Sequence, residues 1–533
     1  MSRPSDHIDE EPTQAPVRNA KLGFTETLRW MWTQLTSMRT ALILLLLLAI
    51  AAIPGSLLPQ RAADPNGVTQ YFASNKDLAP VLDKFQLFDV YTSVWFSAIY
   101  ILLFISLIGC VLPRTKHHWD AMRAKPPRTP SRLSRLPGYT EREFTGVDVE
   151  RAYASAEKVL KSQGYRVERY ERDGEVSVSA ERGYLRETGN LVFHFSLIGV
   201  LIAVGIGGSL GYSGQRVVVE GQAFSNTLLA YDSFSPGRFF SASSLEPYNI
   251  TLNKFTTKFE ERNANAIGQA TDYTASITAQ VRGGQPFDTT IKVNEPLGIG
   301  DTSVYLLGNG YAPVIKVTNS AGEVVFNDAV PFLPQDKNFT SVGVVKLPDG
   351  LAHQLGLIGF FYPTVAEAHG GMKMSTYPDL IDPELTLNVY QGDLGINEGI
   401  PKSVYTLDIK KMTKLTGIKT KLPSLEMKPG QSAKLPNGMG TVTFEKVARY
   451  ASLDVHHDPA QGWVLVFAIL AMLGLFTSLF IPRRRMWVSI RAKKKNTIEL
   501  QYAALARGDD PTLEAAVQRT IDDQIRDLGL TRD

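Results

Sequence analysis

One histidine of this chain lies inside a run of residues that has the composition of a membrane-spanning helix. The run reads GNLVFHFSLIGVLIAVGIGGSLGY, residues 189–212, and His194 is its only ionisable residue. Ionisable groups within a membrane helix are uncommon, and they usually face a bundle interior, a cavity or a cofactor. His194 is therefore a candidate ligand, although its position near the start of the run also fits an interfacial histidine.

A second pair of histidines precedes the last apolar run. His456 and His457 occur in SLDVHHDPAQGWVLVFA, next to Asp458. Neutral imidazole is a common metal ligand and a common axial ligand of haem iron. The pair is therefore a second candidate ligand position, and the alternative is an ordinary surface pair beside an aspartate.

The other histidines suggest less. His117 and His118 stand among Lys and Arg and are most simply interfacial residues, whereas His369 in EAHGGMKM could join Met372 and Met374 as soft metal ligands or lie in a flexible loop. His7 and His353 suggest no role.

Several reaction classes are excluded by absent motifs. The only cysteine is Cys110, and no CxxC or CxxCH occurs, so the chain is neither a thiol reductant nor a c-type cytochrome. Nucleophile-elbow, phosphate-loop, HExxH and dinucleotide motifs are missing too. The glycine-rich GNGYAP, residues 308–313, has a strand-turn-strand context with no helix to bind phosphate.

Four apolar runs predict the elements that position these residues. Ala41 to Leu58, Val94 to Leu112, Leu191 to Leu210 and Gly462 to Ile481 contain no Asp, Glu, Lys or Arg. Runs of about 20 residues cross a hydrocarbon core of about 30 Å as helices. We therefore predict an integral membrane protein with four spanning helices. The first run could also describe a cleaved signal peptide, but its long polar leader favours a retained helix.

Basic residues predict which side of the membrane each segment occupies. Clusters follow the second run (Arg114 to Arg135) and the fourth (Arg483 to Lys495), which the positive-inside rule assigns to the cytoplasm. This juxtamembrane placement explains the clusters without a nucleic-acid partner. The predicted organisation is a cytoplasmic leader (1–36), helix (37–58), external loop (59–93), helix (94–112), cytoplasmic segment (113–190), helix (191–210), external domain (211–461), helix (462–481) and cytoplasmic tail (482–533). The predicted location is the plasma membrane, with both termini cytoplasmic.

The segments between the helices have different patterns. The cytoplasmic segment predicts a small α+β unit, with a helix capped by Asp148 and a hairpin around Asp173-Gly174. The external domain has short alternating strands, which predict antiparallel sheets in a sandwich or in two smaller β units. In the external loop, Leu78 to Phe88 predict a short amphipathic helix lying along the outer surface. In the tail, a solvated amphipathic helix capped by Asp510 is expected. The glycines at 205, 207, 208 and 211 predict a helix-packing face.

Taken in order, five segments resemble the ResB (CcsB) family of System II cytochrome c biogenesis. They are TALILLLLLAIAAIPGSLLPQR, VWFSAIYILLFISLIGCVLPR, AERGYLRETGNLVFHFSLIGVLIAVGIGG, KVNEPLGIGDTSVYLLGNGYAP and HHDPAQGWVLVFAILAMLGLFTSLFIPRRRMWVSI. The ordered combination of these motifs over residues 40–490 is more specific than any one of them alone.

The resemblance implies a non-catalytic or accessory subunit of a haem export and cytochrome c synthase complex. Its expected partners are a CcsA (ResC) type membrane protein with a Trp-rich motif, apocytochrome c, and separate thiol-disulfide proteins that keep the CxxCH reduced. Its expected cofactor is haem b, bound transiently. By resemblance, His194 matches the family's membrane histidine implicated in haem ligation, and His457 matches the external position, with His456 as its alternate.

Two other functions remain open at this stage. The chain could be a structural scaffold for a partner that alone holds haem. It could also be a receptor for an external ligand, although the cytoplasmic segments contain no recognisable output domain.

Overall fold

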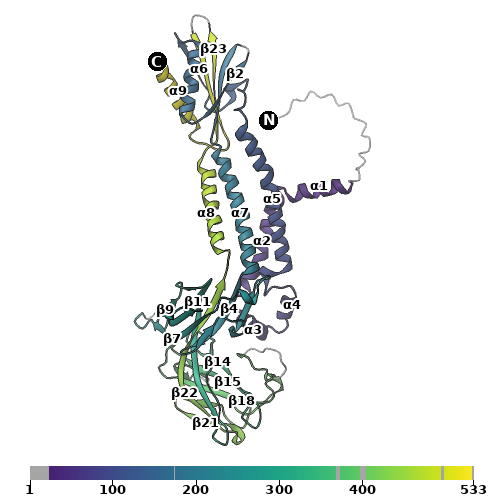
Figure 1. Ribbon diagram of the computed structural model, residues 1–533, viewed down its shortest axis with the longest axis vertical. Coiled ribbons are helices and arrows are strands. Elements are labelled where there is room, and N and C mark those ends of the chain that lie inside the picture. The colour runs from purple at the N-terminus through teal and green to yellow at the C-terminus, as the bar shows by residue number, and fades with distance from the viewer. Residues whose placement is uncertain are drawn as a thin grey trace. The chain divides into compact units, whose positions relative to one another are not determined.

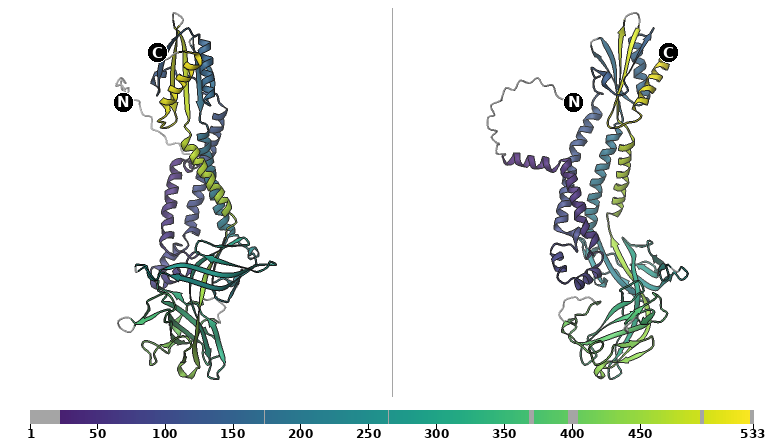
Figure 2. Two further views of the ribbon diagram at one scale, coloured as in Figure 1. Left: turned by 90° about the vertical axis from the view of Figure 1, so that its left-hand side faces the viewer. Right: turned by 180° about the vertical axis from the view of Figure 1, so that it is seen from behind.

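A computed structural model describes residues 23–172, 174–263, 265–367, 372–396, 404–493 and 497–530. The chain divides into two compact units, of which one comprises Met1–Ala203 with Gly462–Asp533 and the other comprises Val204–Gln461. Figures 1 and 2 show both units along the chain. His7 and His369 lie outside the described residues, as do Lys494 and Lys495 of the basic cluster.

The prediction of four membrane-spanning helices is confirmed at the level of length and composition. The helices are α2 (Met38–Leu57), α5 (Val94–Arg123), α7 (Leu185–Leu210) and α8 (Gln461–Phe480), with mean hydropathy from 2.2 to 2.4. α5 and α7 run past the apolar segments into polar sequence. A shorter helix, α1 (Phe24–Leu35), precedes α2. Ser37 and Ser93 cap α2 and α5 by accepting hydrogen bonds from the backbone N–H groups of Thr40 and Phe96.

The segment between α2 and α5 folds around one aromatic side chain. It forms α3 (Pro65–Ser74), α4 (Ala79–Lys84) and the 3₁₀ turn η1 (Val90–Thr92). Phe88 is fully buried with Val68 and Ala79, and Arg61 forms ion pairs with Asp83 and Asp89. The predicted amphipathic helix at 78–88 is therefore shorter than expected, because its last residue turns inward to form this cluster.

The α+β domain of the first unit is one antiparallel sheet covered by two helices (Figure 1). Its strands lie in the order β1-β24-β23-β3-β2. The predicted helix and hairpin are present, and the Asp148 carboxylate accepts a hydrogen bond from Arg151 N at 2.7 Å. The elements are β1 (Thr140–Thr145), α6 (Val149–Ser162), β2 (Arg166–Arg172), β3 (Glu175–Arg182), β23 (Arg484–Lys493), β24 (Thr497–Ala506) and α9 (Leu513–Leu528).

The predicted amphipathic helix in the tail is present as α9, but the expectation that it is solvated is wrong. β23 pairs with both β3 and β24, so the tail supplies the centre of the sheet. α9 buries Leu513, Val517 and Ile521 in the domain core. Asp510 pairs with Arg484 at 2.6 Å, and α9 begins after Thr512. Met486, Val488 and Ile490 alternate along β23 toward the domain core, and this period-two pattern is the signal of a strand within the basic cluster.

The second unit is the β domain, and the prediction of mainly antiparallel sheets is confirmed. Its strands are β4 (Tyr212–Val219), β5 (Ala223–Ser225), β6 (Ser233–Pro236), β7 (Tyr248–Phe259), β8 (Ala270–Val281), β9 (Phe287–Lys292), β10 (Leu297–Ile299), β11 (Thr302–Thr318), β12 (Val324–Ala329), β13 (Leu333–Pro334), β14 (Ser341–Leu347), β15 (Leu355–Tyr362), β16 (Val365–Glu367), β17 (Lys373–Ser375), β18 (Glu384–Gln391), β19 (Thr413–Lys414), β20 (Leu425–Met427), β21 (Ser432–Lys434) and β22 (Thr441–His457).

Two cores share the long pair formed by β11 and β22. Val304 and Leu453 belong to one core, whereas Ile315 and Phe444, further along the same strands, belong to the other. GNGYAP lies within β11 as continuous strand with a bulge near Gly308, so the expected turn there is wrong. Gly310 faces Tyr450, whose ring lies where a Cβ atom would be. Glycine is therefore required there by packing rather than by a turn.

Candidate functional site

His194 lies in the interior of α7, nine residues after the helix begins at Leu185. Nine residues correspond to about 14 Å of helix, of which the first turns, Leu185 to Asn190, are mainly polar. The imidazole Nδ1 is 2.7 Å from the carbonyl oxygen of Asn190. Because a carbonyl can only accept, Nδ1 is the protonated nitrogen of the neutral imidazole, and in that tautomer Nε2 carries the lone pair. Nε2 has no hydrogen-bond partner among the described residues, so it is free to ligate a metal.

The side chain of His194 lines an apolar groove with a volume of about 470 Å³. Three helices each present one face to it: Met38, Ala41, Leu42, Leu45 and Leu48 of α2, Leu103, Leu107, Cys110, Val111 and Arg114 of α5, and His194, Leu197, Val200 and Leu201 of α7. The volume and the predominantly apolar walls are typical of a site for a small organic molecule or cofactor. Arg114 supplies the only formal charge in the lining.

Helices α7 and α8 cross at two glycines next to this site. A Cβ atom on Gly474 would lie 2.6 Å from the backbone nitrogen of Phe193 and 2.7 Å from the carbonyl oxygen of Gly189. A Cβ atom on Gly189 would lie 2.8 Å from the carbonyl oxygen of Gly474. The backbones therefore touch one residue before His194.

The prediction that the outer glycines of α7 form the packing face is partly wrong. Gly205 and Gly208 have no atom within 4 Å of an added Cβ, whereas Gly207 meets Asp458 and Gly211 meets the carbonyl oxygen of His457. Glycine is common in membrane helices, so its presence alone does not identify a helix crossing.

His118 belongs to a buried polar network that the sequence did not suggest. Its ring is 6% exposed, with Nε2 at 3.0 Å from the Thr188 hydroxyl and Nδ1 at 3.5 Å from the Glu187 carboxylate. Glu187 also pairs with Arg483 and Arg507. From the sequence, His118 is expected simply as an interfacial residue; α5 continues as helix to Arg123, and the side chain of His118 is buried against α7.

A second carboxylate completes this network. Arg483 contacts Glu181 at 2.8 Å, and Arg485 contacts it at 3.0 Å. Burial favours the neutral form of Glu181, but hydrogen bonds from Tyr184, Arg483 and Arg485 outweigh burial and lower its pKa. Glu181 is therefore ionised at neutral pH and holds the start of β23 against the end of β3.

His456 and His457 point to opposite faces of β22, because side chains alternate along a strand. His457 stacks on Tyr212 with ring centroids 5.2 Å apart, and its Nδ1 is 3.0 Å from the carbonyl oxygen of Asp301. His456 is more exposed, and its Nε2 lies 2.7 Å from the Asp454 carboxylate. The hydrogen bond to Asp454 raises the pKa of His456.

The two neighbours are therefore not interchangeable as ligands. In His457, as in His194, Nδ1 is held by a carbonyl and Nε2 has no hydrogen-bond partner among the described residues. In His456, Nε2 contacts the Asp454 carboxylate, and the raised pKa favours the protonated ring, which opposes metal binding. His353 lies in an exposed loop away from any such arrangement.

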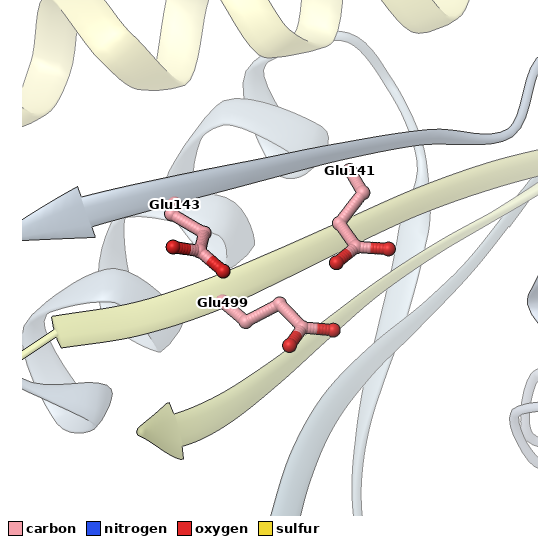
Figure 3. A group of neighbouring side chains, drawn as sticks. All are labelled: Glu141, Glu143 and Glu499. Carbon is pink, nitrogen blue, oxygen red and sulfur yellow. The ribbon is translucent and has the colours of Figure 1, made fainter. Parts of the chain in front are cut away.

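One group of acidic side chains in the α+β domain has the spacing of metal ligands. Glu141, Glu143 and Glu499 lie close together on neighbouring strands (Figure 3). Glu143 and Glu499 are paired across β1 and β24, and Lys493 contacts both carboxylates. The hydrogen bond from Lys493 is the main cause of the lowered pKa of Glu499. The ammonium group therefore takes the place of a cation, and the cluster is structural.

The fold defines a membrane protein with four helices long and apolar enough to span the membrane, and His194 lines an apolar groove among three of them. Comparison with family models matches residues 38–518 to the ResB-like family, and the chain belongs to that family.

Relatives with a shared name support this assignment. The chain is 27% identical over 286 residues to "Cytochrome c biogenesis protein CcsB" of Synechococcus sp. (strain CC9311), a match that covers 52% of this chain and 59% of the relative. It is 26% identical over 467 residues to the protein of the same name from Synechococcus sp. (strain RCC307), with 85% and 88% of the two chains covered. The match to the first relative therefore spans under two thirds of that protein's length.

Proposed function

We propose that this chain is a haem-handling subunit of a membrane complex for cytochrome c biogenesis, which delivers haem to extracytoplasmic apocytochromes c for attachment at CxxCH. The observation that carries the proposal is the position of His194, with a proton-free Nε2 directed by a fixed Nδ1 contact and with apolar walls around it. Metal-ligating histidines almost always have their other nitrogen held in this way. The family and the names of its relatives agree with this function.

In this proposal the residues of the chain bind and orient, while haem supplies the iron and the vinyl groups that form thioether bonds. Nε2 of His194 would hold the iron as a ligand. The leucines and valines of α2, α5 and α7 exclude water from the macrocycle, which lowers the local dielectric and influences the iron potential. His457, with its Nδ1 fixed in the same manner, is the proposed second ligand position, and His456 is not.

The proposed topology places both termini and the α+β domain in the cytoplasm and the β domain outside. The basic residues of the α+β domain near the ends of α5 and α8, including Arg483 and Arg485, support this orientation. The expected partners are a CcsA-type membrane protein and apocytochrome c. Cys110 is the only cysteine, so thiol-disulfide exchange on the apocytochrome requires separate proteins.

Deletion of the gene, followed by complementation, tests the proposal. Strains carry wild type or His194→Ala, and membrane proteins are stained for covalent haem after denaturing electrophoresis. We expect the deletion and His194→Ala to lose c-type haem while the variant stays at normal abundance. Retention of c-type haem in the deletion strain contradicts the haem-delivery function. Loss in the deletion but normal staining with His194→Ala indicates a scaffold whose partner alone holds haem.

A further inference from the structure

Arg114 connects the apolar groove of His194 to a polar pocket beside it. The polar pocket has a volume of about 390 Å³ and is lined by Pro113, Arg114, His117, His118, Glu187, Asn190, Leu191 and Arg507. Arg114 is the one residue that lines both this pocket and the groove. It follows Cys110, another residue of the groove lining, by four positions, so both lie on one face of α5.

The charge of Arg114 is not neutralised within the described part of the chain. Its guanidinium group contacts the sulfur of Met38 at 3.9 Å, and no ion pair joins it to a described carboxylate. Arg507, the other arginine of the polar pocket, differs because it pairs with Glu187. Arg114 is exposed, so its unpaired guanidinium group is accessible to an anionic partner at the edge of the groove.

We infer that Arg114 binds the carboxylate edge of an amphipathic porphyrin whose apolar macrocycle occupies the groove and whose iron meets His194. This inference rests on the proposed function and adds a carboxylate-binding residue to it. The groove requires a ligand that is apolar over most of its surface and anionic at one end, and an iron porphyrin with two propionates has this form. The planar guanidinium group of Arg114 can form two parallel hydrogen bonds with a carboxylate at the edge of the porphyrin. His194, which lines the apolar part of the groove, would face the iron at the centre of the macrocycle.

A third pocket, of about 810 Å³, shares His117 and Arg507 with the polar pocket and is lined by residues of α5 and of the α+β domain. Its arginines are already paired, Arg483 and Arg485 with Glu181 and Arg507 with Glu187. Arg114 is therefore the arginine of these pockets that has no carboxylate partner among the described residues.

Binding of two porphyrins to the purified full-length chain in lipid nanodiscs tests the inference. The probes are iron protoporphyrin IX and its dimethyl ester, which has no carboxylate charge, and the measurement is the absorbance titration of the Soret band. We expect wild type to prefer the free acid by about 10- to 150-fold, the range for hydrogen bonds to charged groups. Arg114→Gln loses this preference, and Arg114→Lys retains part of it because the charge remains without the planar fork.

Arg123→Gln is the matched control. Arg123 ends the same helix, stacks on Trp119, and is absent from the linings of the three pockets, so the variant keeps the preference of wild type. If Arg114→Gln still prefers the free acid, the inference is wrong while the proposed function stands. If Arg114→Gln instead releases a copurified phospholipid and leaves the porphyrin preference unchanged, the groove is a lipid site. If wild type binds neither probe, both the inference and direct haem binding by this chain fail.

Discussion

The glycine crossing of α7 and α8 gives a direct test of whether helix packing positions His194. In Gly474→Ala, the new Cβ atom would lie 2.6 Å from the backbone nitrogen of Phe193, whereas ordinary van der Waals contact begins at 3.4 Å. The helices must therefore separate by roughly 0.8 Å, because backbone atoms cannot rotate away as side chains do. Overpacking of this kind costs about 1 to 3 kcal/mol.

The separation moves the backbone immediately before His194. Misplacement of a positioned group by about 1 Å can reduce a reaction rate on the order of 100-fold. We therefore expect Gly474→Ala to lower c-type haem nearly as far as His194→Ala, at a protein abundance sufficient for complementation. The assay is haem staining of membranes, together with thermal stability of the purified protein by size-exclusion chromatography after heating.

Gly462→Ala on the same helix is the matched control. No atom lies within 4 Å of a Cβ at Gly462, so this variant is neutral or slightly more stable, because alanine favours helix over glycine. If membranes with Gly474→Ala contain as much c-type haem as wild type and the variant is equally stable, the close crossing of α7 and α8 does not exist in the protein. If it is less stable but stains normally, the crossing is real and does not position the ligand.

The remaining predictions concern the α+β domain and the external histidines. Asp510→Ala removes the ion-pair partner of the nearly buried Arg484 and is expected to lower the free energy of unfolding of the domain by about 3 to 5 kcal/mol, measured by hydrogen exchange of the β23 amides. Asp509→Ala changes an exposed neighbour and is expected to leave this free energy unchanged. The hydrogen bond from Arg484 lowers the pKa of Asp510 in the folded protein. The ionised carboxylate therefore contributes fully to the free energy of unfolding above the unfolded-state pKa of about 3.9, and this contribution is lost as the pH falls through the lower folded-state pKa. Asp510→Asn should flatten that acid dependence. His457→Ala should reduce c-type haem in the same staining assay, whereas His456→Ala should not; the reverse result would contradict the role assigned to Nδ1 anchoring.

Elements specified by local sequence were predictable, and those specified by long-range pairing were not. The four helices follow from apolar length, and α6 follows from the Asp148 cap and the glycine after it. The tail strands were missed because their cations suggested only membrane proximity. Their partner strand β3 lies some 300 residues earlier in the chain, and no local pattern reports such a pairing.

The sequence identifies His194 as a candidate site residue, but it does not show which other residues line the groove around it. An ionisable group in an apolar run is a local signal, and this signal identifies His194. The neighbouring Arg114 looked like one of many juxtamembrane cations, because only the packing of α2, α5 and α7 brings it to the same lining. His456 and His457 were equivalent by position, and the strand register of β22 separates them onto two faces.

The sheet of the α+β domain also fixes the helix crossing at the site. β3 ends at Arg182 and leads into α7, whereas α8 leads into β23, and Arg182 pairs in register with Arg484. At Gly183 the chain passes so close to the carbonyl of Pro482 that a Cβ atom would lie 2.2 Å from it. The two helices thus leave adjacent strands with their ends held together and meet at Gly189 and Gly474 shortly afterwards. A slip of one residue between β3 and β23 would turn every core side chain of β23 outward, so the register is strongly specified. The tail therefore acts on the His194 site through the backbone, even though it contributes no residue to the groove.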